Sequence, residues 1–452
     1  MLNNSTMQGR LKILVACFPA DGHFKPLTGI AKYLDACGHD VRWYASKEYT
    51  NDIAGLGMKH YPFRIAKDLH ISYMEVHYPE RAKIKNPVRK LNFDMIHVFV
   101  ERGEEYMKDI DEIRQNFPPD IVICDIAFPG IPYIKDCMKL PVIAVSVFPF
   151  PGSSCDLPPY GLGLTPANTS AGKIFHKGLR WLSRKILFRK ADSAMRKALE
   201  KYSIAHNNTG IFDIGYKKSD IVLQSGCPSF DYKRSDLDKR VRFIGAVLPY
   251  RKSNQVTSWF DKRLEGYKIV VLVTQGTVEK DPSKLIIPTL EAFKDDEDVL
   301  VVCTTGNANT EALRAKYNAP NIIIEDFIPF ENIMPYTNVF ITNGGYGGVL
   351  LGIEHKMPMV VAGVHEGKNE ICARVGYFKY GINLKTERPG AARIKKAVKE
   401  IFETPVYKAN VVRLAQELNS YATDALVEKY IDELINNRSP KCRQSLLPET
   451  VY

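Results

Sequence analysis

The sequence predicts an α/β protein with two doubly wound halves, each a parallel sheet covered by helices on both faces. Short apolar runs alternate with amphipathic segments from residue 12 to residue 248, and a second series of the same kind begins at residue 268. The stretch between the two series, residues 249–266, is polar and charged, as expected of a linker. The chain has 452 residues, which is more than one core ordinarily supports.

The first series opens with a strand–helix–strand unit. Residues 12–18 are expected to form a strand and residues 19–25 a loop, and the next helix is expected to open with Pro26, whose fixed φ suits a first turn. Gly38 ends that helix, and residues 41–45 form the second strand. Strands joined by one crossover helix must be parallel. Later strands of this half are expected at residues 120–125, 142–147, 221–224 and 241–248.

Two segments in the middle of this half stand out. Residues 153–172 are rich in Pro, Gly and Ser, which is typical of a binding loop or lid. In residues 173–202, Lys and Arg alternate with large apolar side chains, which predicts a basic amphipathic helix. Such a helix can lie on an anionic membrane. We favour the alternative, a solvated helix whose apolar stripe packs on its own domain.

The second half repeats the alternation of strands and helices. Strands are expected at residues 268–273, 299–303, 322–324 and 359–362, and helices at residues 282–293, 393–402 and 411–435 and near 370–375. The predicted organisation is a first domain at residues 1–248, a linker at 249–266, a second domain at 267–405, helices at 406–436 that pack back on the first domain, and a tail at 437–452.

Composition narrows the function classes. Apolar residues make up 45% and charged residues 25%, which are ordinary globular values. The net charge of +11 is compatible with an anionic partner, but no nucleic-acid-binding motif is present, so we expect no nucleic acid. The nine cysteines are scattered and never form C-x-x-C, which predicts neither disulfides nor structural zinc and favours the reducing cytoplasm. The apolar runs are too short to span a membrane.

A glycine turn is the first candidate for chemistry. An apolar run ending at Thr342 meets Gly344, Gly345, Gly347 and Gly348 and then another apolar segment, which indicates a strand, a turn and a helix. Backbone N–H groups beside a helix N-terminus favour an anion such as a pyrophosphate. The spacing is not G-x-G-x-x-G, so it is not a dinucleotide fingerprint, and a purely structural turn is the alternative.

His23 and Asp125 are the second candidate. Both follow predicted strands of the first half, and open α/β sheets bind their ligands beyond the carboxyl ends of strands. A neutral histidine is suited to be a general base, and a carboxylate can hold its ring in one tautomer. No serine completes a hydrolase triad, so the nucleophile would be a hydroxyl of the substrate. A merely solvated loop histidine is the alternative.

Together these features resemble the GT-B glycosyltransferases of the family that includes plant secondary-metabolite and bacterial macrolide glycosyltransferases. The likeness covers residues 12–435, and its specific parts are Gly22-His23-x-x-Pro26 and the run from Phe327 to Arg374. The chain looks most like the bacterial enzymes that decorate flavonoids and similar phenols, some of which use a deoxythymidine diphosphate (dTDP) sugar such as dTDP-rhamnose. The resemblance implies an inverting, metal-independent hexosyltransferase with a nucleoside diphosphate sugar as co-substrate and no other cofactor.

The resemblance also implies roles for single residues. His23 would take the proton from the acceptor hydroxyl, and Asp125 would stabilise the imidazolium. On the donor side, Phe327 would stack on the base, the backbone of Ile328 would bond its edge, and the N–H groups of Gly347 and Gly348 would hold the diphosphate. Further donor contacts are expected from Thr274, Thr277, Asn343, Gly345, Glu366 and Lys368. An apolar acceptor pocket is expected to include Phe24, Phe93, Phe128, Phe148 and Phe150, from a first half rich in aromatics.

Three departures from the family pattern bear on specificity. Asn343 replaces a histidine that commonly touches a phosphate, and an amide can still donate. Leu351 replaces a Glu that binds the ribose hydroxyls in relatives that use uridine donors. Without this Glu, no hydrogen-bond acceptor is available for a ribose 2′-hydroxyl. The deoxyribose of a dTDP donor lacks that hydroxyl and leaves nothing unpaired, so we expect a dTDP donor. In the family, an Asp-Gln pair binds the hydroxyls of the donor sugar. An ungapped alignment places Gly367 and Lys368 at these two positions, whereas a small shift of the alignment lets Glu366 take the place of the acid.

Other functions remain open. The same fold could carry a uridine diphosphate (UDP) sugar to a lipid, a sterol or a macrolide, and a nucleotide-sugar-binding protein that has lost catalysis is an alternative of another class. We expect no metal site, because the acidic run at residues 295–298 is expected to be a solvated turn, and His355 and His365 lack zinc spacing. The oligomeric state is left open.

Overall fold

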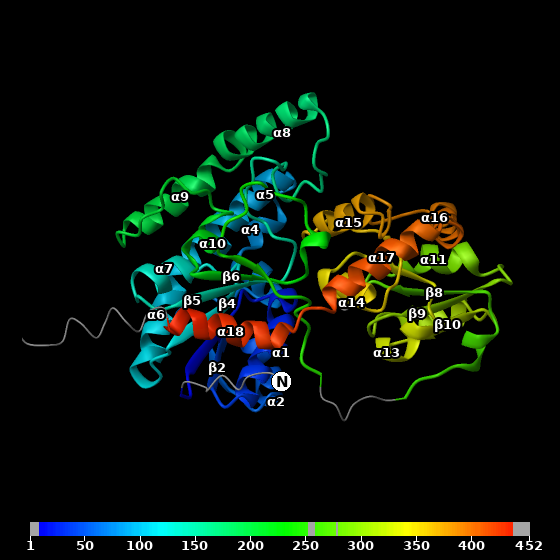
Figure 1. Cartoon of the computed structure of the whole chain (residues 1–452), viewed down its shortest axis with the longest axis horizontal. Coiled ribbons are helices and arrows are strands. Elements are labelled where there is room, and N and C mark those ends of the chain that lie inside the picture. The colour runs from blue at the N-terminus through cyan, green and yellow to red at the C-terminus, as the bar shows by residue number, and fades with distance from the viewer. Residues whose placement is uncertain (1–8, 252–257, 277–278, 437–452) are drawn as a thin grey trace, which may run out of the picture.

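The computed structural model describes residues 9–251, 258–276 and 279–436. It contains two parallel sheets, one in each half of the chain, which lie side by side (Figure 1). The strand order is β3-β2-β1-β4-β5-β6-β7 in the first sheet and β10-β9-β8-β11-β12-β13 in the second. The predicted fold class is therefore confirmed.

The first sheet reverses its order between β1 and β4. Its strands are β1 (Lys12–Ala16), β2 (Asp40–Ala45), β3 (Lys59–Pro62), β4 (Ile121–Asp125), β5 (Val142–Ser146), β6 (Ile221–Gln224) and β7 (Val241–Phe243). β1 pairs with both β2 and β4, and Ala16 lies opposite Cys124. A ligand crevice of an open α/β sheet lies beyond the carboxyl ends of strands at such a reversal. Phe18 and Asp125 occupy these two ends.

Helices cover both faces of the first sheet. They are α1 (Asp21–Ala36), η1 (Lys47–Tyr49), α2 (Thr50–Gly55), α3 (Ile71–His77), α4 (Pro79–Ala82), α5 (Pro87–Asp94), η2 (Met95–Val100), α6 (Glu101–Asn116), α7 (Ile131–Asp136), α8 (Ser170–Leu182), η3 (Ser183–Leu187), α9 (Arg189–Glu200), α10 (Ile214–Lys218) and η4 (Pro228–Phe230). One face buries Leu27 and Trp43, and the other buries Tyr44 and Tyr106. This two-sided burial explains why the strands are apolar throughout.

The second sheet is built in the same way. Its strands are β8 (Ile269–Thr274), β9 (Val299–Thr304), β10 (Ile322–Glu325), β11 (Val339–Thr342), β12 (Met359–Val361) and β13 (Gly381–Asn383). The helices around it are η6 (Lys262–Glu265), α11 (Ile286–Phe293), α12 (Thr310–Lys316), α13 (Phe330–Ile333), η7 (Met334–Tyr336), α14 (Tyr346–Glu354), α15 (Lys368–Tyr377), α16 (Ala391–Glu403) and α17 (Pro405–Leu418).

The closing helices divide between the two halves. In α17, Val411 and Leu414 belong to the apolar core of the second half. The last helix, α18 (Thr423–Asn436), crosses back, and its Val427 and Ile431 are buried in the core of the first half (Figure 1). Tyr33 on α1 also donates its hydroxyl to Glu428 on α18 at 3.0 Å. Helix α18 thus packs on the first half, whereas α17 packs mainly on the second half and contacts the first half through Ser229, whose N–H donates to Glu417 at 3.3 Å.

Helix α1 begins earlier than its sequence suggests. It starts at Asp21, five residues before Pro26, which lies inside the helix. Ala20 has extended backbone dihedrals, and its carbonyl accepts the N–H groups of His23 and Phe24. Pro26 has no N–H to donate to the carbonyl of Gly22, four residues back, so the helix accommodates it at the loss of that hydrogen bond. The predicted loop at residues 19–25 is therefore wrong, and His23 lies in the first turn of a helix.

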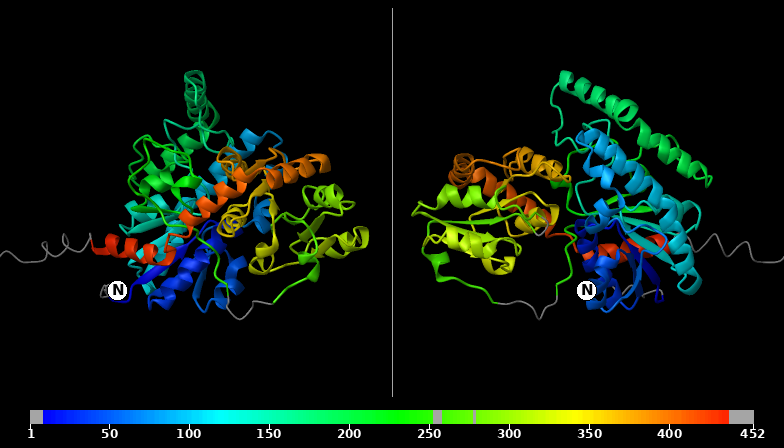
Figure 2. Two further views of the ribbon diagram at one scale, coloured as in Figure 1. Left: turned by 45° about the vertical axis from the view of Figure 1, so that its right-hand side comes forward. Right: turned by 180° about the vertical axis from the view of Figure 1, so that it is seen from behind.

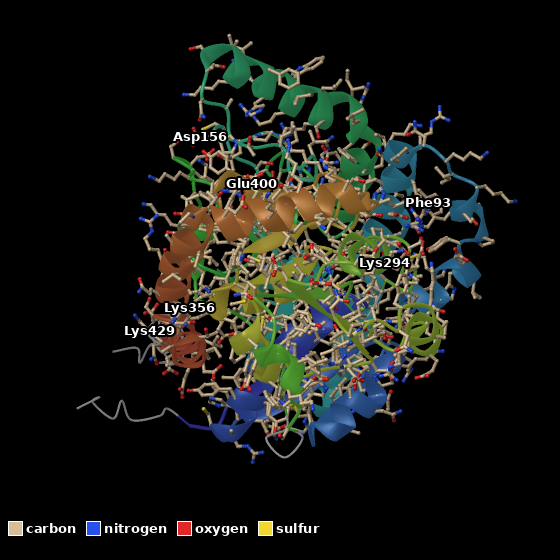
Figure 3. All side chains as sticks on the ribbon, turned by 90° about the vertical axis from the view of Figure 1, so that its right-hand side faces the viewer. Phe93, Asp156, Lys294, Lys356, Glu400 and Lys429 are labelled. Atoms are coloured by element: carbon tan, nitrogen blue, oxygen red, sulfur yellow. The ribbon has the colours of Figure 1, made fainter. Side chains whose placement is uncertain are left out.

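The predicted packing of the basic segment is correct for α9 and wrong for α8. In α9, Met195 and Leu199 are buried against the first half. In α8, by contrast, Ile174, Phe175 and Trp181 are 72%, 59% and 59% exposed. Figure 2 shows α8 standing off the body at the upper edge of the molecule in both views. In Figure 3, seen from the side of the second half, it again lies at the top, with Asp156 below it.

Across the described ranges, no helix combines the length and apolarity that crossing a bilayer requires.

Candidate active site

His23 and Asp125 form a hydrogen-bonded pair at the reversal of the first sheet. His23 Nδ1 lies 2.8 Å from Asp125 Oδ1, although 102 positions separate the two residues in the sequence. The fully buried Asp125 carboxylate also accepts the backbone N–H groups of Phe18, at 2.5 Å, and Ala127, at 2.9 Å. A carboxylate can only accept, so Nδ1 of the histidine carries the proton. Nε2 is thereby left as the basic nitrogen.

Aromatic rings surround the imidazole. The ring of His23 meets Phe18 edge-on at 5.5 Å between centroids and Phe148 at 5.7 Å. The His23 side chain nevertheless remains 21% exposed. Its position is that of a general base: oriented by a buried carboxylate, walled by apolar rings and open to a reactant.

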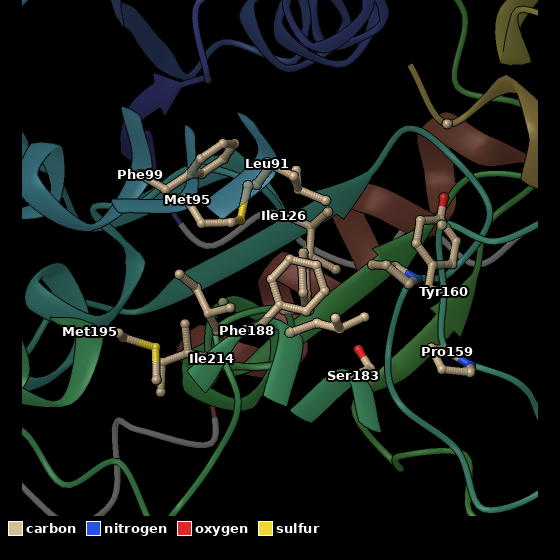
Figure 4. A pocket seen from close by; sticks show the side chains of 18 of the residues that line it. Leu91, Met95, Phe99, Ile126, Pro159, Tyr160, Ser183, Phe188, Met195 and Ile214 are labelled. Carbon is tan, nitrogen blue, oxygen red and sulfur yellow. The ribbon is translucent and has the colours of Figure 1, made fainter. Parts of the chain in front are cut away.

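A cavity of about 700 Å³ lies beside this pair. Phe148, which touches His23, is part of its wall, as are Phe99 and Tyr160. Figure 4 shows mainly apolar side chains around it, contributed by several elements. The second half also reaches the cavity, with its segment 364–367 and Asn369. The cavity therefore lies where the two halves meet, and it suits a large apolar ligand.

The predicted acceptor aromatics divide into two groups. Phe128 and Phe148 line the cavity. Phe24 is instead buried in the core and stacked on Tyr49, since it lies in α1 rather than in a loop. Phe93 packs on His97 at 4.3 Å, and Phe150 is buried against Tyr216. The structure separates these last three residues from the cavity.

Much of the remaining wall comes from the basic segment. Its contribution is Leu179, Leu182, Ser183, Leu187, Phe188, Met195, Ala198 and Leu199. This contribution to the cavity wall was not predicted from the sequence. The one available signal was the apolar stripe itself, which pointed to packing against protein rather than to a ligand space.

The glycine turn presents a free helix N-terminus. Gly345 caps α14 with extended dihedrals (φ −62°, ψ 136°), so the first turn holds Tyr346, Gly347 and Gly348. The first N–H groups of a helix have no partner within it. A Cβ added to Gly347 or Gly348 would meet nothing within 4 Å, so the space beside these two Cα atoms is open. Gly344 has φ +79°, and a Cβ there would lie 2.4 Å from the Cys372 sulfur, so only glycine fits.

Tyr346 joins this turn to the first half. Its hydroxyl donates to the carbonyl oxygen of Ser225 at 2.6 Å. The side-chain amide of Gln224 donates to Ser225 O and to Phe148 O, each at 2.8 Å. Phe148 in turn contacts His23. The structure thus brings the imidazole and the glycine turn to the same interface, as the sequence analysis required. Tyr346, Ser225 and Gln224 were not predicted, since they belong to no motif.

The other predicted donor residues lie around the carboxyl ends of the second sheet. Thr274 ends β8 beside Thr342 of β11. Phe327 is 57% exposed after β10, as a stacking platform requires, and Ile328 is buried. The Asn343 amide donates to the carbonyl of Gln275 at 2.5 Å, which ties the turn to the end of β8. Thr277 lies outside the described residues.

Glu366 and Lys368 lie where the second half of the chain reaches the cavity. Glu366 has φ +56°, lines the cavity and pairs with Lys368 at 2.6 Å between Oε2 and Nζ. Lys368 is the first residue of α15. The pair places a carboxylate and an ammonium group at the edge of the cavity.

Glu370 ties the next part of this helix to the predicted binding loop. Its carboxylate accepts the N–H groups of Gly161 and Gly163, each at 2.8 Å. The buried Arg374 bonds Glu370 at 3.1 Å and Asp231 at 2.7 Å. Residues 161–163 are thereby held against the second half. This network was not predicted, because its members are far apart in the chain.

Among the described residues, one group of ligand-type side chains converges, namely Cys155, Asp156 and Asp236. All three are exposed. The two carboxylates already accept hydrogen bonds from Ser235 and Ser154. These bonds account for the cluster as a loop contact. In the acidic run at residues 295–298, Asp296 pairs with Lys395 at 2.8 Å.

The chain is similar in sequence to a known protein family and to several known proteins. Residues 291–434 match the family described as erythromycin biosynthesis protein CIII-like, C-terminal domain. The 4'-demethylrebeccamycin synthase of Lentzea aerocolonigenes is 32% identical over 420 residues, which are 92% of this chain and 97% of that protein. UDP-glucosyltransferase 1 of Beauveria bassiana (strain ARSEF 2860) is 28% identical over 453 residues, covering 95% of this chain and 97% of its own length.

Solved structures share the fold. The calicheamicin glycosyltransferase CalG4 has a TM-score of 0.74 at 19% identity and covers 96% of this chain and 100% of its own. The spinosyn rhamnosyltransferase SpnG complexed with thymidine diphosphate has a TM-score of 0.64 at 14% identity and covers 93% of this chain and 100% of its own.

Proposed function

The chain belongs to the family 1 glycosyltransferases of GT-B fold, and we propose that it moves a sugar, with inversion, from a nucleoside diphosphate to a hydroxyl of a large apolar acceptor. The observation that carries this proposal is the His23–Asp125 pair, whose imidazole contacts Phe148 in the wall of the apolar cavity. A base beside an acceptor-sized space, with a helix N-terminus suited to a diphosphate at the same interface between the halves, fits sugar transfer.

The reaction needs one displacement. Nε2 of His23 takes the proton of the acceptor hydroxyl while the acceptor oxygen forms a bond to the anomeric carbon. The bond between that carbon and the diphosphate oxygen breaks, and its electron pair leaves with the diphosphate. Attack comes from the face opposite the leaving group, so the configuration inverts. Asp125 stabilises the imidazolium that forms, at 2.8 Å from Nδ1.

We assign the leaving diphosphate to the N-terminus of α14. The N–H groups of Gly347 and Gly348 lie in the first turn of α14, where they have no partner within the helix, and the positive end of the helix dipole favours the charge that develops there. Phe327 is the proposed platform for the base, and the backbone of Ile328 would bond its edge. Thr274 and Asn343 complete the phosphate side, and Glu366 and Lys368 would bind sugar hydroxyls.

A dTDP sugar is the favoured donor. Leu351 is a buried residue of α14 and offers no acceptor for a ribose 2′-hydroxyl. Deoxyribose lacks that group, so nothing is left unpaired. Rhamnose also lacks a 6-hydroxyl and needs fewer polar partners. The name of the Beauveria relative supports the second candidate, a UDP-glucose donor.

The proposed acceptor is a flavonoid or a larger flat phenol. A cavity of about 700 Å³ with apolar walls exceeds the needs of a single phenol ring and lies within the range of drug-sized ligand sites. Sterols and macrolides are the alternative acceptors for such a space.

A product survey tests the proposal. The purified chain is incubated with dTDP-rhamnose, dTDP-glucose or UDP-glucose and a panel of flavonoids, polycyclic phenols, sterols and macrolides, and the products are analysed by mass spectrometry. We expect a mass increment of one deoxyhexose or hexose on a polycyclic phenol, which is absent with His23→Ala. Binding of thymidine diphosphate without any product across the panel would instead favour the catalytically lapsed binding protein.

A further inference from the structure

Helix α8 carries large apolar side chains on its outer surface. Ile174 and Trp181 are seven residues apart and so share one face, and both are well exposed. Phe175 and Leu182 repeat the same spacing on the adjoining face and are exposed as well. The opposite side of the helix faces the body, where His176 is buried and Leu179 lines the cavity. The outer apolar face thus has no covering within the described residues.

The same segment is strongly basic. Between residues 157 and 191 the chain has seven Lys or Arg and no Asp or Glu, namely Lys173, Lys177, Arg180, Arg184, Lys185, Arg189 and Lys190. Within the described ranges none of the seven forms a salt bridge. Lys177 of α8 and Arg184 of η3, which continues α8, are seven residues apart and lie beside the apolar residues of this segment. Cations that flank an exposed apolar stripe match a surface with an apolar interior and anionic headgroups.

The mouth of the cavity continues this surface. Five of its lining residues are themselves large, apolar and exposed: Val88, Leu91, Leu162, Leu182 and Phe212. Leu182 belongs to both α8 and this rim. An exposed apolar rim beside a basic amphipathic helix matches the chemistry of an anionic lipid surface.

We propose that the outer face of α8, together with the apolar rim, docks on an anionic lipid bilayer, so that the acceptor cavity opens toward the membrane. A second copy of the chain is disfavoured as the occupant, because it would present the same basic face. The docking itself stands on the exposed residues alone. Delivery of an apolar acceptor from the bilayer rests on the proposed function.

Vesicle flotation of the full chain tests the docking. We expect the protein to float with vesicles of 70% phosphatidylcholine and 30% phosphatidylglycerol and to remain below with pure phosphatidylcholine. Raising the salt from 50 to 500 mM should weaken the binding, since screening shortens the reach of the charges.

Two double variants address the two parts of the surface. Lys177→Glu with Lys185→Glu removes two cations, each of which contributes on the order of fivefold to partitioning, so we expect binding to fall by more than about 25-fold. Ile174→Ser with Trp181→Ser removes the apolar contact and should also abolish flotation. Neither pair lines the cavity. The matched control is Lys396→Glu with Lys399→Glu on exposed positions of α16, which should float like the wild type.

The outcomes of flotation and of the transfer assay distinguish membrane docking from its alternatives. Absence of flotation at 50 mM salt, or flotation that both variants retain, would overturn the proposal. So would self-association that depends on Trp181, detected by light scattering, because a second copy would then cover the face. Transfer to a water-soluble acceptor should be equal in all variants. A loss of flotation with unchanged transfer therefore tests docking separately from the proposed function, which fails only if transfer itself is absent.

Discussion

Tyr346 of the glycine turn donates its hydroxyl to the backbone carbonyl of Ser225 in the other half of the molecule, at 2.6 Å. Burial raises the pKa of this hydroxyl well above its usual value, so it stays a donor across the physiological range. The bond holds the N-terminus of α14 against the end of β6. At that end Gln224 contacts Phe148, and Phe148 contacts His23. Catalysis by groups on two domains requires that the domains be held in a fixed relative position.

Tyr346→Phe should therefore loosen the interface while keeping the ring. We expect the free energy of unfolding to fall by about 1 kcal/mol, the ordinary net contribution of one hydrogen bond. We also expect kcat to fall more than the affinity for nucleoside diphosphate, since the turn stays intact while its position relative to His23 relaxes. Urea denaturation, steady-state kinetics and calorimetric titration provide the three values. An unchanged kcat would show that the bond is merely structural.

His23→Ala should reduce kcat by about 10²–10⁴-fold, the usual contribution of a positioned general base. Binding of nucleoside diphosphate should stay within twofold, because the imidazole contacts no proposed donor residue. Asp125→Asn is the companion variant, and it should lower kcat by orienting the ring less well. Its melting temperature must be measured alongside, because Asp125 also accepts two backbone N–H groups. Substantial transfer by His23→Ala would contradict the assigned base.

Leu351→Glu should shift donor preference toward uridine sugars. The new carboxylate provides an acceptor for the ribose 2′-hydroxyl, and a hydrogen bond to a charged group is worth about 1.5–3 kcal/mol. We expect the ratio of kcat/KM for UDP-glucose over dTDP-glucose to rise on the order of tenfold. Leu351→Gln serves as the neutral control, with a smaller shift. If wild type already prefers the uridine donor, the proposed dTDP specificity is wrong.

Glu370→Ala should release the loop at residues 161–163 and leave the buried Arg374 with Asp231 as its remaining carboxylate. Breaking a buried ion pair costs about 3–5 kcal/mol, and the retained Asp231 contact places the expected loss near the lower end. Limited proteolysis should cut residues 151–169 faster. Glu370→Gln still accepts from the two glycine N–H groups, so its loop should resist cleavage better than that of the alanine variant. Equal cleavage of all three proteins would contradict the anchoring of this loop by Glu370.

Stability should fall as the pH drops through the histidine range, in part because of His176. Burial lowers the pKa of this histidine, and the nearby Arg180 lowers it further. Between the lowered value and the ordinary value of about 6.5, the unfolded chain binds a proton that the folded chain does not. Stability is therefore retained above about pH 6.5 and lost below it. His176→Gln should show a smaller drop in melting temperature from pH 7.5 to pH 5.5, and parallel curves would refute the assignment.

Local patterns sufficed for the outline of the molecule. Apolar runs separated by amphipathic segments predict two parallel sheets, because strands buried on both faces cannot alternate polar and apolar residues. His23 and Asp125 could be paired from sequence for a similar reason. His23 lies shortly after β1 and Asp125 ends β4, and these strands are neighbours at the reversal of the sheet, so their carboxyl ends meet.

Other features depended on which surfaces meet. Phe24 looked like an acceptor contact until helix α1 began at Asp21 and turned its ring into the core. The apolar stripe of α8 predicted packing on the protein. A stripe shows only that one face of the helix is apolar. Whether protein, ligand or lipid covers that face depends on segments far away in the sequence. The Tyr346–Ser225 and Glu370–Gly161 contacts likewise join residues 121 and 209 positions apart. Periodicity along a chain is short-ranged, whereas contacts between domains arise only when the folded halves pack.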